Sequence, residues 1–233
     1  IFTRRKLLAT IPAMLPFAAS AQSFPSRPIR VVVPYPAGGS TDQLARAIQQ
    51  PLAELLGQPL FIDNKAGASG AIGTDAVVKA PADGYTLVFG NTGPNAVIQL
   101  LTKVPYDPVR DLRPISTVAL TPMILAVPAD SPARTVKEFL SYARQQDGAL
   151  NYGSVGIGSL SHLTGELFND MANLKIQHIP YSGGAPMLSA FAGGQLHAAF
   201  VTGLDGASLL ASGKVRYLGV ATPQRTDIVP GLP

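Results

Sequence analysis

Residues 29–42 of this 233-residue chain, IRVVVPYPAGGSTD, decide the fold. The stretch begins with the apolar residues of a strand, passes through Tyr35 and the pair Gly38-Gly39, and continues as an amphipathic helix. A glycine pair between a strand and a helix leaves backbone N–H groups uncovered at the helix N-terminus. With the positive end of the helix dipole, these groups form an anion site that needs no lysine or arginine. Because later loops repeat the device, the sequence predicts capture of a small acid.

Strand-like and helix-like segments alternate along almost the whole chain. This alternation predicts an α/β fold with largely parallel sheets and with helices on both faces. Strands are expected at 29–35, 59–63, 85–90, 123–127, 150–153, 176–179, 197–201 and 215–221. Helices are expected at 41–56, 71–79, 136–146, 159–172, 185–191 and 205–212, with Pro51 kinking or splitting the first. A boundary between two units of roughly 100 residues is expected near Thr121-Pro122.

Residues 1–21 have the pattern of a secretory signal peptide. A basic region at 3–6 precedes a short apolar core at 7–19 and a small-residue cleavage site at 19–21. The core is too short to span a bilayer, and Arg4-Arg5 leaves both the general secretory and the twin-arginine routes open. We expect the mature protein to begin at Gln22 and to be exported and soluble.

Charge and composition exclude several classes of function. The chain has 18 Lys and Arg against 14 Asp and Glu; three of the basic residues lie in the signal segment, so the remainder is 15 minus 14, or +1. This balance argues against nucleic-acid binding, which needs a basic stripe on the folded domain. The absence of cysteine excludes thiol nucleophiles, and the three histidines lack metal-ligand spacing. No cofactor and no metal are expected.

Four loops follow the carboxyl ends of predicted strands, which is where α/β sheets bind ligands. Each contains glycine and precedes a predicted helix or cap: Tyr35–Asp42, Gly90–Asn95, Gly153–Ser159 and Pro180–Gly184. Their backbone amides and hydroxyl groups are the candidate ligand groups.

Two of the glycine-rich motifs also match enzyme signatures. Gly156-Ile157-Gly158 resembles half of a dinucleotide-binding fingerprint, but Ser161 stands at the last glycine position, so a capped helix start is the simpler interpretation. The segment 67–71 falls one residue short of GxSxG. A serine hydrolase would use Ser69 with Asp170 and either His178 or His197, although nothing in their spacing favours a triad.

Asp42 and His162 each have two interpretations. An acid at a helix N-terminus is stabilised by the dipole, so Asp42 either caps the helix or receives an amino or hydroxyl group of a ligand. His162 stands in the first turn of a predicted helix, where it either lines a pocket or is a partly exposed helix residue.

Several motifs, in order, resemble the Bug family of extracytoplasmic solute receptors, which are similar to the binding component of tripartite tricarboxylate transporters. They are YPAGGSTD at 35–42, DNKAGASG at 63–70, PADGYTL at 81–87, NYGS at 151–154, GIGS at 156–159 with His162, and HIPYSGGAP at 178–186. The resemblance covers the chain from about Phe24 to its end. It implies a two-lobed type II periplasmic-binding-protein fold, with one lobe at 22–122, the other at 123–221, and 222–233 returning to the first.

The resemblance also implies a function and a set of binding residues. A monomeric periplasmic receptor would close on a small carboxylate, without catalysis of its own, and present it to membrane transporter subunits or to a sensor. The implied ligand-binding residues are Tyr35, Gly38, Gly39, Ser40, Asp42, Asn91 and Thr92 in the first lobe, and Ser154, Gly156, Gly158, Ser159, Tyr181, Ser182, Gly183 and Asp205 in the second.

Two features depart from the family pattern. Ser182 stands where many relatives carry lysine, so a positive charge is missing at that edge of the expected cleft. The chain stops at Pro233, where relatives usually continue for several dozen residues, so an incomplete first lobe is expected. A remnant that no longer binds a ligand is therefore a further interpretation.

Overall fold

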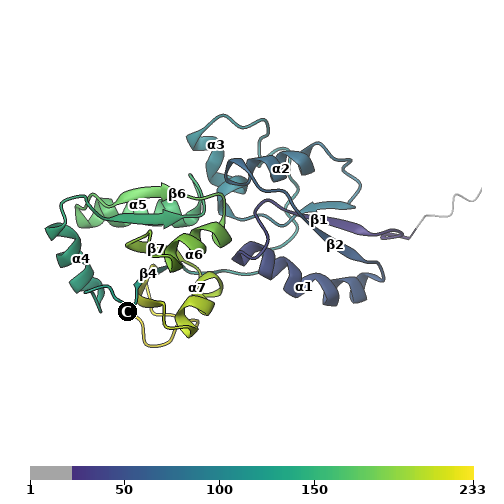
Figure 1. The fold of residues 1–233 in the computed structure, drawn as a ribbon. Coiled ribbons are helices and arrows are strands. Elements are labelled where there is room, and N and C mark those ends of the chain that lie inside the picture. The colour runs from purple at the N-terminus through teal and green to yellow at the C-terminus, as the bar shows by residue number, and fades with distance from the viewer. Residues whose placement is uncertain (1–22) are drawn as a thin grey trace, which may run out of the picture.

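The computed structural model describes residues 23–233, so the predicted signal peptide lies outside the described residues. Two lobes lie next to each other (Figure 1). The strands are β1 (Ile29–Val33), β2 (Leu60–Asn64), β3 (Thr86–Val88), β4 (Ile124–Pro128), β5 (Asn151–Ser154), β6 (Gln177–Pro180), β7 (Ala198–Val201) and β8 (Val215–Val220). The helices are α1 (Ser40–Leu56), α2 (Ala71–Val78), α3 (Ile98–Leu101), α4 (Val136–Gln145), α5 (Leu160–Ala172), α6 (Gly184–Ala192) and α7 (Gly203–Ala211), with a 3-10 turn η1 (Ala68–Gly70) and a π-helix η2 (Gly93–Val97).

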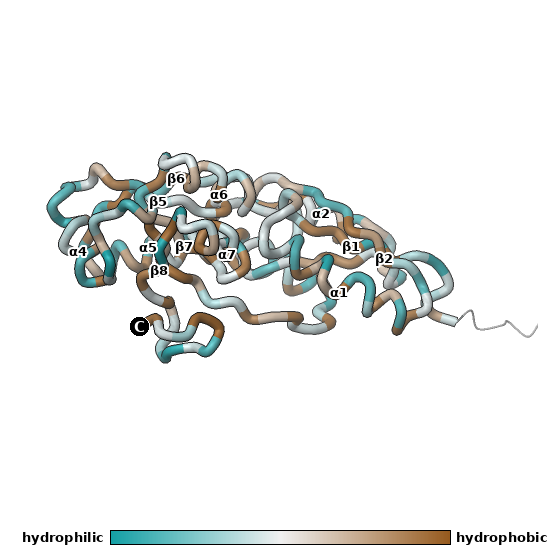
Figure 2. Tube along the Cα trace, turned by 60° about the horizontal axis from the view of Figure 1, so that its bottom comes forward, coloured by the Kyte–Doolittle hydropathy of each residue, from teal (hydrophilic) through white to brown (hydrophobic). Residues whose placement is uncertain are grey.

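The first lobe contains a three-stranded parallel sheet in the order β2-β1-β3. Helices α1 and α2 lie on opposite faces of this sheet (Figure 1). Ile29 and Leu60 form a buried cluster against which Leu52 and Leu56 of α1 pack. The hydrophobic strand β1 runs through the interior of the lobe (Figure 2), so both of its faces are covered, as the unbroken apolar run of its sequence predicts.

The second lobe contains a five-stranded mixed sheet in the order β6-β5-β7-β4-β8. Strand β5 is parallel to β6 and β7, whereas β4 is antiparallel to both β7 and β8. The sheets are thus largely parallel, as expected, and β4 is the strand that runs against its neighbours. This strand is reached by a long irregular connection from the first lobe, so no helical crossover requires it to run parallel to its neighbours.

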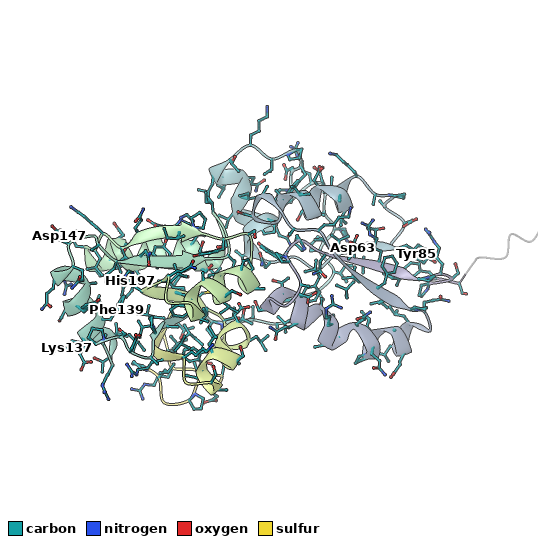
Figure 3. All side chains as sticks on the ribbon, viewed as in Figure 1. Asp63, Tyr85, Lys137, Phe139, Asp147 and His197 are labelled. Carbon is teal, nitrogen blue, oxygen red and sulfur yellow. The ribbon has the colours of Figure 1, made fainter. Side chains whose placement is uncertain are left out.

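Alternation along β4 explains how the second lobe buries both faces of its sheet. Ile124 belongs to one buried cluster with Met187 of α6. The next residue, Leu125, belongs to the opposite cluster with Phe139 of α4, whose side chain lies toward the end of the molecule far from the first lobe (Figure 3). Successive side chains of a strand point to opposite faces, so one apolar strand supplies two cores.

The structure confirms the fold class and contains all eight expected strands and all six expected helices. Helix α1 continues through Pro51, so the expected split does not occur. Helices η2 and α3 are not among the expected helices, because η2 (GPNAV) carries glycine and proline and α3 (IQLL) is too short to show an amphipathic pattern. Within the described residues, no helix is both long and apolar enough to cross a membrane.

The last residues of the chain pack against the second lobe. Val229 and Leu232 contact the buried cluster of that lobe, and the Val220 N–H donates to the Pro233 carbonyl over 3.0 Å. The C-terminus accordingly lies beside β4 and α7 (Figure 1). The sequence prediction had assigned residues 222–233 to the first lobe, whereas their described contacts are with the second.

Candidate functional site

The four predicted loops meet where the two lobes touch. A Cβ atom added to Gly93 of the Gly90–Asn95 loop would lie 3.5 Å from the Gly158 carbonyl oxygen. A Cβ atom added to Gly39 would lie 3.6 Å from the Cα of Gly184, and one added to Gly183 would lie 2.5 Å from Pro36 Cδ. Another added to Gly158 would lie 3.0 Å from the side chain of Leu101, which follows the Gly90–Asn95 loop. The N-termini of α1 and α6 therefore approach each other across the interlobe boundary at backbone distance, whereas the loop before α5 faces the segment 93–101.

The N-terminus of α1 is organised by Asp42. The Gly38 N–H donates to its carboxylate over 2.9 Å, Arg46 Nε donates over 2.9 Å, and Asn64 Nδ2 donates over 2.9 Å. Burial opposes ionisation, but these hydrogen bonds outweigh it and lower the pKa of Asp42 below its usual value. Because the side chain is 3% exposed and already has these donors, the geometry favours the capping role over contact with a ligand.

Asp205, from the first turn of α7 in the second lobe, reaches the same helix terminus. The Ser40 N–H donates to its Oδ1 over 2.7 Å, and Thr202 Oγ1 donates to its Oδ2 over 2.9 Å. Asp205 is 5% exposed. A carboxylate therefore occupies the α1 N-terminus, which is the kind of group the glycine loop was predicted to hold.

Tyr35 and Asn91 form a polar cluster behind the first loop. The Tyr35 hydroxyl donates to Asn91 Oδ1 over 3.1 Å, and Asn91 Nδ2 donates to Thr41 Oγ1 over 3.3 Å. Burial raises the pKa of Tyr35 to about 12. Thr92 begins the π-helix without a side-chain cap and is exposed. Tyr35 and Asn91 thus fix the loop, whereas the Thr92 side chain is accessible to solvent.

The third loop turns its hydroxyl groups inward. Ser154 Oγ is hydrogen-bonded to His178 Nε2 at 2.6 Å and accepts the Gly156 N–H over 3.1 Å. Ser159 Oγ donates to the Gly156 carbonyl over 2.6 Å and caps α5. Both serines are buried. They shape the loop, so contact with a ligand falls to its backbone, and the capped helix start is the interpretation that this geometry favours over a dinucleotide site.

Two histidines lie beneath this loop. The rings of His162 and His178 have centroids 4.1 Å apart, and His162 Nδ1 accepts the Gly158 N–H over 3.1 Å. Burial, with a smaller electrostatic contribution from the neighbouring His162, lowers the pKa of His178 to about 4. The sequence offers His178 as a possible triad partner of Ser69. Its contact with Ser154 could not be found from sequence, because 24 positions separate the two.

The fourth loop leaves a helix start open at the boundary. Helix α6 begins after Gly183 with no side-chain cap. The Tyr181 N–H donates to the Ser154 carbonyl over 3.0 Å, which ties this loop to the third. Ser182 is exposed, and Gly183 and Gly184 are buried against the first lobe. The first amides of α6 therefore point to the place where the lobes meet.

The arrangement needed for a hydrolase is not formed. Ser69 lies at the interlobe boundary, where a Cβ on Gly156 would come within 2.7 Å of its Oγ. However, His178 is bonded to Ser154, and His197 is bonded to Asn151 in the part of the second lobe that lies away from the boundary (Figure 3). Among residues 23–233, no group of three or more His, Cys, Asp or Glu side chains could hold a metal ion.

Ser69 is a boundary residue in its own right, and its backbone is in the left-handed region with φ of 53°. Its carbonyl accepts the Tyr35 hydroxyl over 3.3 Å. A cavity of about 390 Å³ lies elsewhere, between α7 and the segments at 121–122 and 228–229. The candidate site is therefore defined by the facing loops and by Asp205 rather than by that apolar cavity.

Comparisons with known proteins agree with this geometry. The chain is 38% identical over 234 residues to a UPF0065 protein from the tcbD-tcbE intergenic region of Pseudomonas sp. strain P51, covering 99% of this chain and 70% of that protein. It is 34% identical over 235 residues to BugT of Bordetella pertussis, covering 98% of this chain and 72% of that protein.

Solved structures give the same relationship. An R. palustris protein solved with adipate has a TM-score of 0.88 and 40% identity, covering 91% of this chain and 71% of that one. MatC from Rhodopseudomonas palustris, solved with malate, has a TM-score of 0.83 and 34% identity, and the match covers 90% of this chain and 72% of MatC. The family model described as the tripartite tricarboxylate transporter family receptor matches residues 44–233. The chain therefore belongs to the tripartite tricarboxylate transporter receptor family, whose members are solute-binding proteins of the periplasm.

Proposed function

We propose that this receptor captures a small carboxylate between its two lobes and delivers it to a membrane transporter of the tripartite tricarboxylate type, without catalysis of its own. The observation that carries the proposal is the contact between Asp205 and the Ser40 N–H. It supports the inference that the α1 N-terminus is shaped for a carboxylate group. The neighbours solved with adipate and malate add support from the family.

Backbone groups would hold the ligand in this proposal. Most of the polar side chains at the boundary are already engaged: Asp42, Tyr35, Ser154 and Ser159 all have partners within their own lobes. The uncapped start of α6 and the remaining amides of α1 are left for a ligand. Closure of the lobes excludes water, which strengthens charge-assisted amide–carboxylate hydrogen bonds in a lower dielectric.

A graded pair of variants tests the proposal. A Cβ at Gly39 would lie 3.6 Å from Gly184, which is ordinary contact, so Gly39→Ala should retain binding. The branches of valine extend further, so Gly39→Val should abolish binding of small carboxylates in calorimetry while the second lobe still melts cooperatively. If Gly39→Val binds as the parent does, the ligand lies elsewhere. If no carboxylate shifts a cooperative melt of the parent, the proposal fails.

A further inference from the structure

Asp205 places a fixed negative charge between two helix N-termini. Its Oδ1 accepts the Ser40 N–H at the start of α1 over 2.7 Å. A Cβ added to Gly184, the first residue of α6, would lie 3.0 Å from the same oxygen. One carboxylate of the protein therefore sits beside both the α1 and the α6 terminus.

These two termini differ from those of α5 and α7. Helices α5 and α7 are capped by the side chains of Ser159 and Thr202, whereas α1 and α6 begin at glycines that offer no side-chain cap. An uncapped start with free amides and a positive dipole end favours an anion. At α1 the protein supplies that anion itself.

The charge of Asp205 is balanced by one helix amide and a hydroxyl rather than by a cation. None of the ion pairs among the described residues includes it. Its nine-tenths burial keeps water from screening it strongly. A second negative charge brought to the same place would therefore be repelled.

We propose that Asp205 takes the place of one ligand carboxylate and makes this protein a receptor for monocarboxylates whose other end is neutral or positively charged. The inference rests on the proposed function and specifies its ligand class. The single carboxylate of the ligand binds backbone amides of the third loop, whose serine side chains are engaged inside the lobe, and a second carboxylate placed near the starts of α1 and α6 meets Asp205. An ammonium or uncharged end meets an attractive or neutral surface instead.

Ligands of equal chain length test this charge selection. Calorimetry of the whole chain compares adipate, hexanoate and 6-aminohexanoate, and then succinate, butyrate and 4-aminobutyrate. We expect the monocarboxylate or amino acid of a set to bind about tenfold or more tightly than the dicarboxylate. Asp205→Asn retains an oxygen for the Ser40 N–H and removes the charge, so it should reduce or reverse the preference. Asp130→Asn, at an exposed turn residue, is the control for net charge and should leave it unchanged.

Each other outcome overturns a defined part of the argument. A parent protein that binds adipate or succinate as tightly as its monocarboxylate partner overturns the charge selection and leaves the proposed function standing. A folded Asp205→Asn variant with an unchanged preference overturns the role of Asp205; Asp205→Ser replaces it if the asparagine variant does not fold. If the parent binds no member of either set while another small carboxylate shifts its melt, this inference fails and the proposed function stands; if no small carboxylate shifts the melt, both fail.

Discussion

Substitution of Gly184 by alanine perturbs the interlobe contact at one atom. Gly184 is the first residue of α6 and has no positive φ, so alanine suits its backbone. The added Cβ would lie 3.0 Å from Asp205 Oδ1 and 3.2 Å from the Cα of Gly39. Both distances are a few tenths of an ångström shorter than ordinary contacts, and one partner is backbone. The lobes must therefore separate or the Asp205 carboxylate must move.

The magnitude follows from the hydrogen bond that lies at this point. Displacement of Asp205 weakens its bond with the Ser40 N–H, and hydrogen bonds to charged groups contribute about 1.5–3 kcal/mol. Loss of this contribution from the closed form lowers ligand affinity by about tenfold to a hundredfold. Alanine favours a helix by up to about 1 kcal/mol over glycine, so the stability of the second lobe should be unchanged or higher. Affinity and stability are thus expected to change in opposite directions.

Calorimetry, chemical denaturation and small-angle scattering measure these effects. Gly203→Ala is the matched control, because Gly203 is the first residue of the adjacent helix α7. A Cβ atom added there would lie 3.9 Å from Ile228 Cγ2, which is an ordinary van der Waals contact. The control should gain the same helix stability and keep both its affinity and its compact scattering profile. If Gly184→Ala binds and scatters as the parent does, the two lobes do not depend on this contact and the reasoning is refuted.

Three further substitutions test other parts of the structure. Gly165→Ala should destabilise the second lobe by about 1–3 kcal/mol in chemical denaturation, because its Cβ would overlap the ring of Tyr152; an unchanged midpoint would contradict this packing. Burial, together with the neighbouring histidine, lowers the pKa of His178 from 6.5 to about 4. The imidazole therefore binds a proton more readily in the unfolded chain than in the folded protein. As a result, the free energy of unfolding should fall as pH drops from 6.5 to about 4. His178→Gln should flatten that profile in thermal melts, whereas the exposed His197→Gln should preserve it. Asp42→Asn should destabilise the first lobe by about 1–3 kcal/mol, since its three donors lose a charged acceptor; an equal melting temperature would leave Asp42 available to a ligand.

Local patterns in the sequence predict most of the fold. Apolar runs give the strands, and glycine followed by serine or threonine gives the helix starts, because both signals depend on neighbouring residues. The direction of β4, in contrast, could not be predicted from a local pattern. Its alternation is compatible with either direction, and the direction is set by a connection with no regular structure. Helices η2 and α3 were missed for a separate, local reason, because both are short and η2 carries glycine and proline.

The candidate site shows the same difference between features that depend on neighbouring residues and features that depend on distant ones. The loops were predictable because each follows a strand, and the parallel strands bring their carboxyl ends to one edge. The roles of side chains within the loops were not predictable. Ser154 and Ser159 carry hydroxyl groups at the right positions, yet His178 and the Gly156 carbonyl engage them inside the lobe. Asp205 is 165 positions from Ser40, so only the fold shows that they meet.

The difference between backbone amides and side chains bears on how the receptor selects its ligand. Backbone amides at helix starts recognise any carboxylate, so they supply affinity with little discrimination. Most of the polar side chains at the boundary are committed to positioning those amides, as Asp42 and Ser154 are. Asp205 also has partners, but it crosses from one lobe to the other and brings a buried charge to the place where the helix starts converge. Differences in ligand choice among receptors with this architecture should therefore follow the residue at the position of Asp205 more closely than the glycine loops.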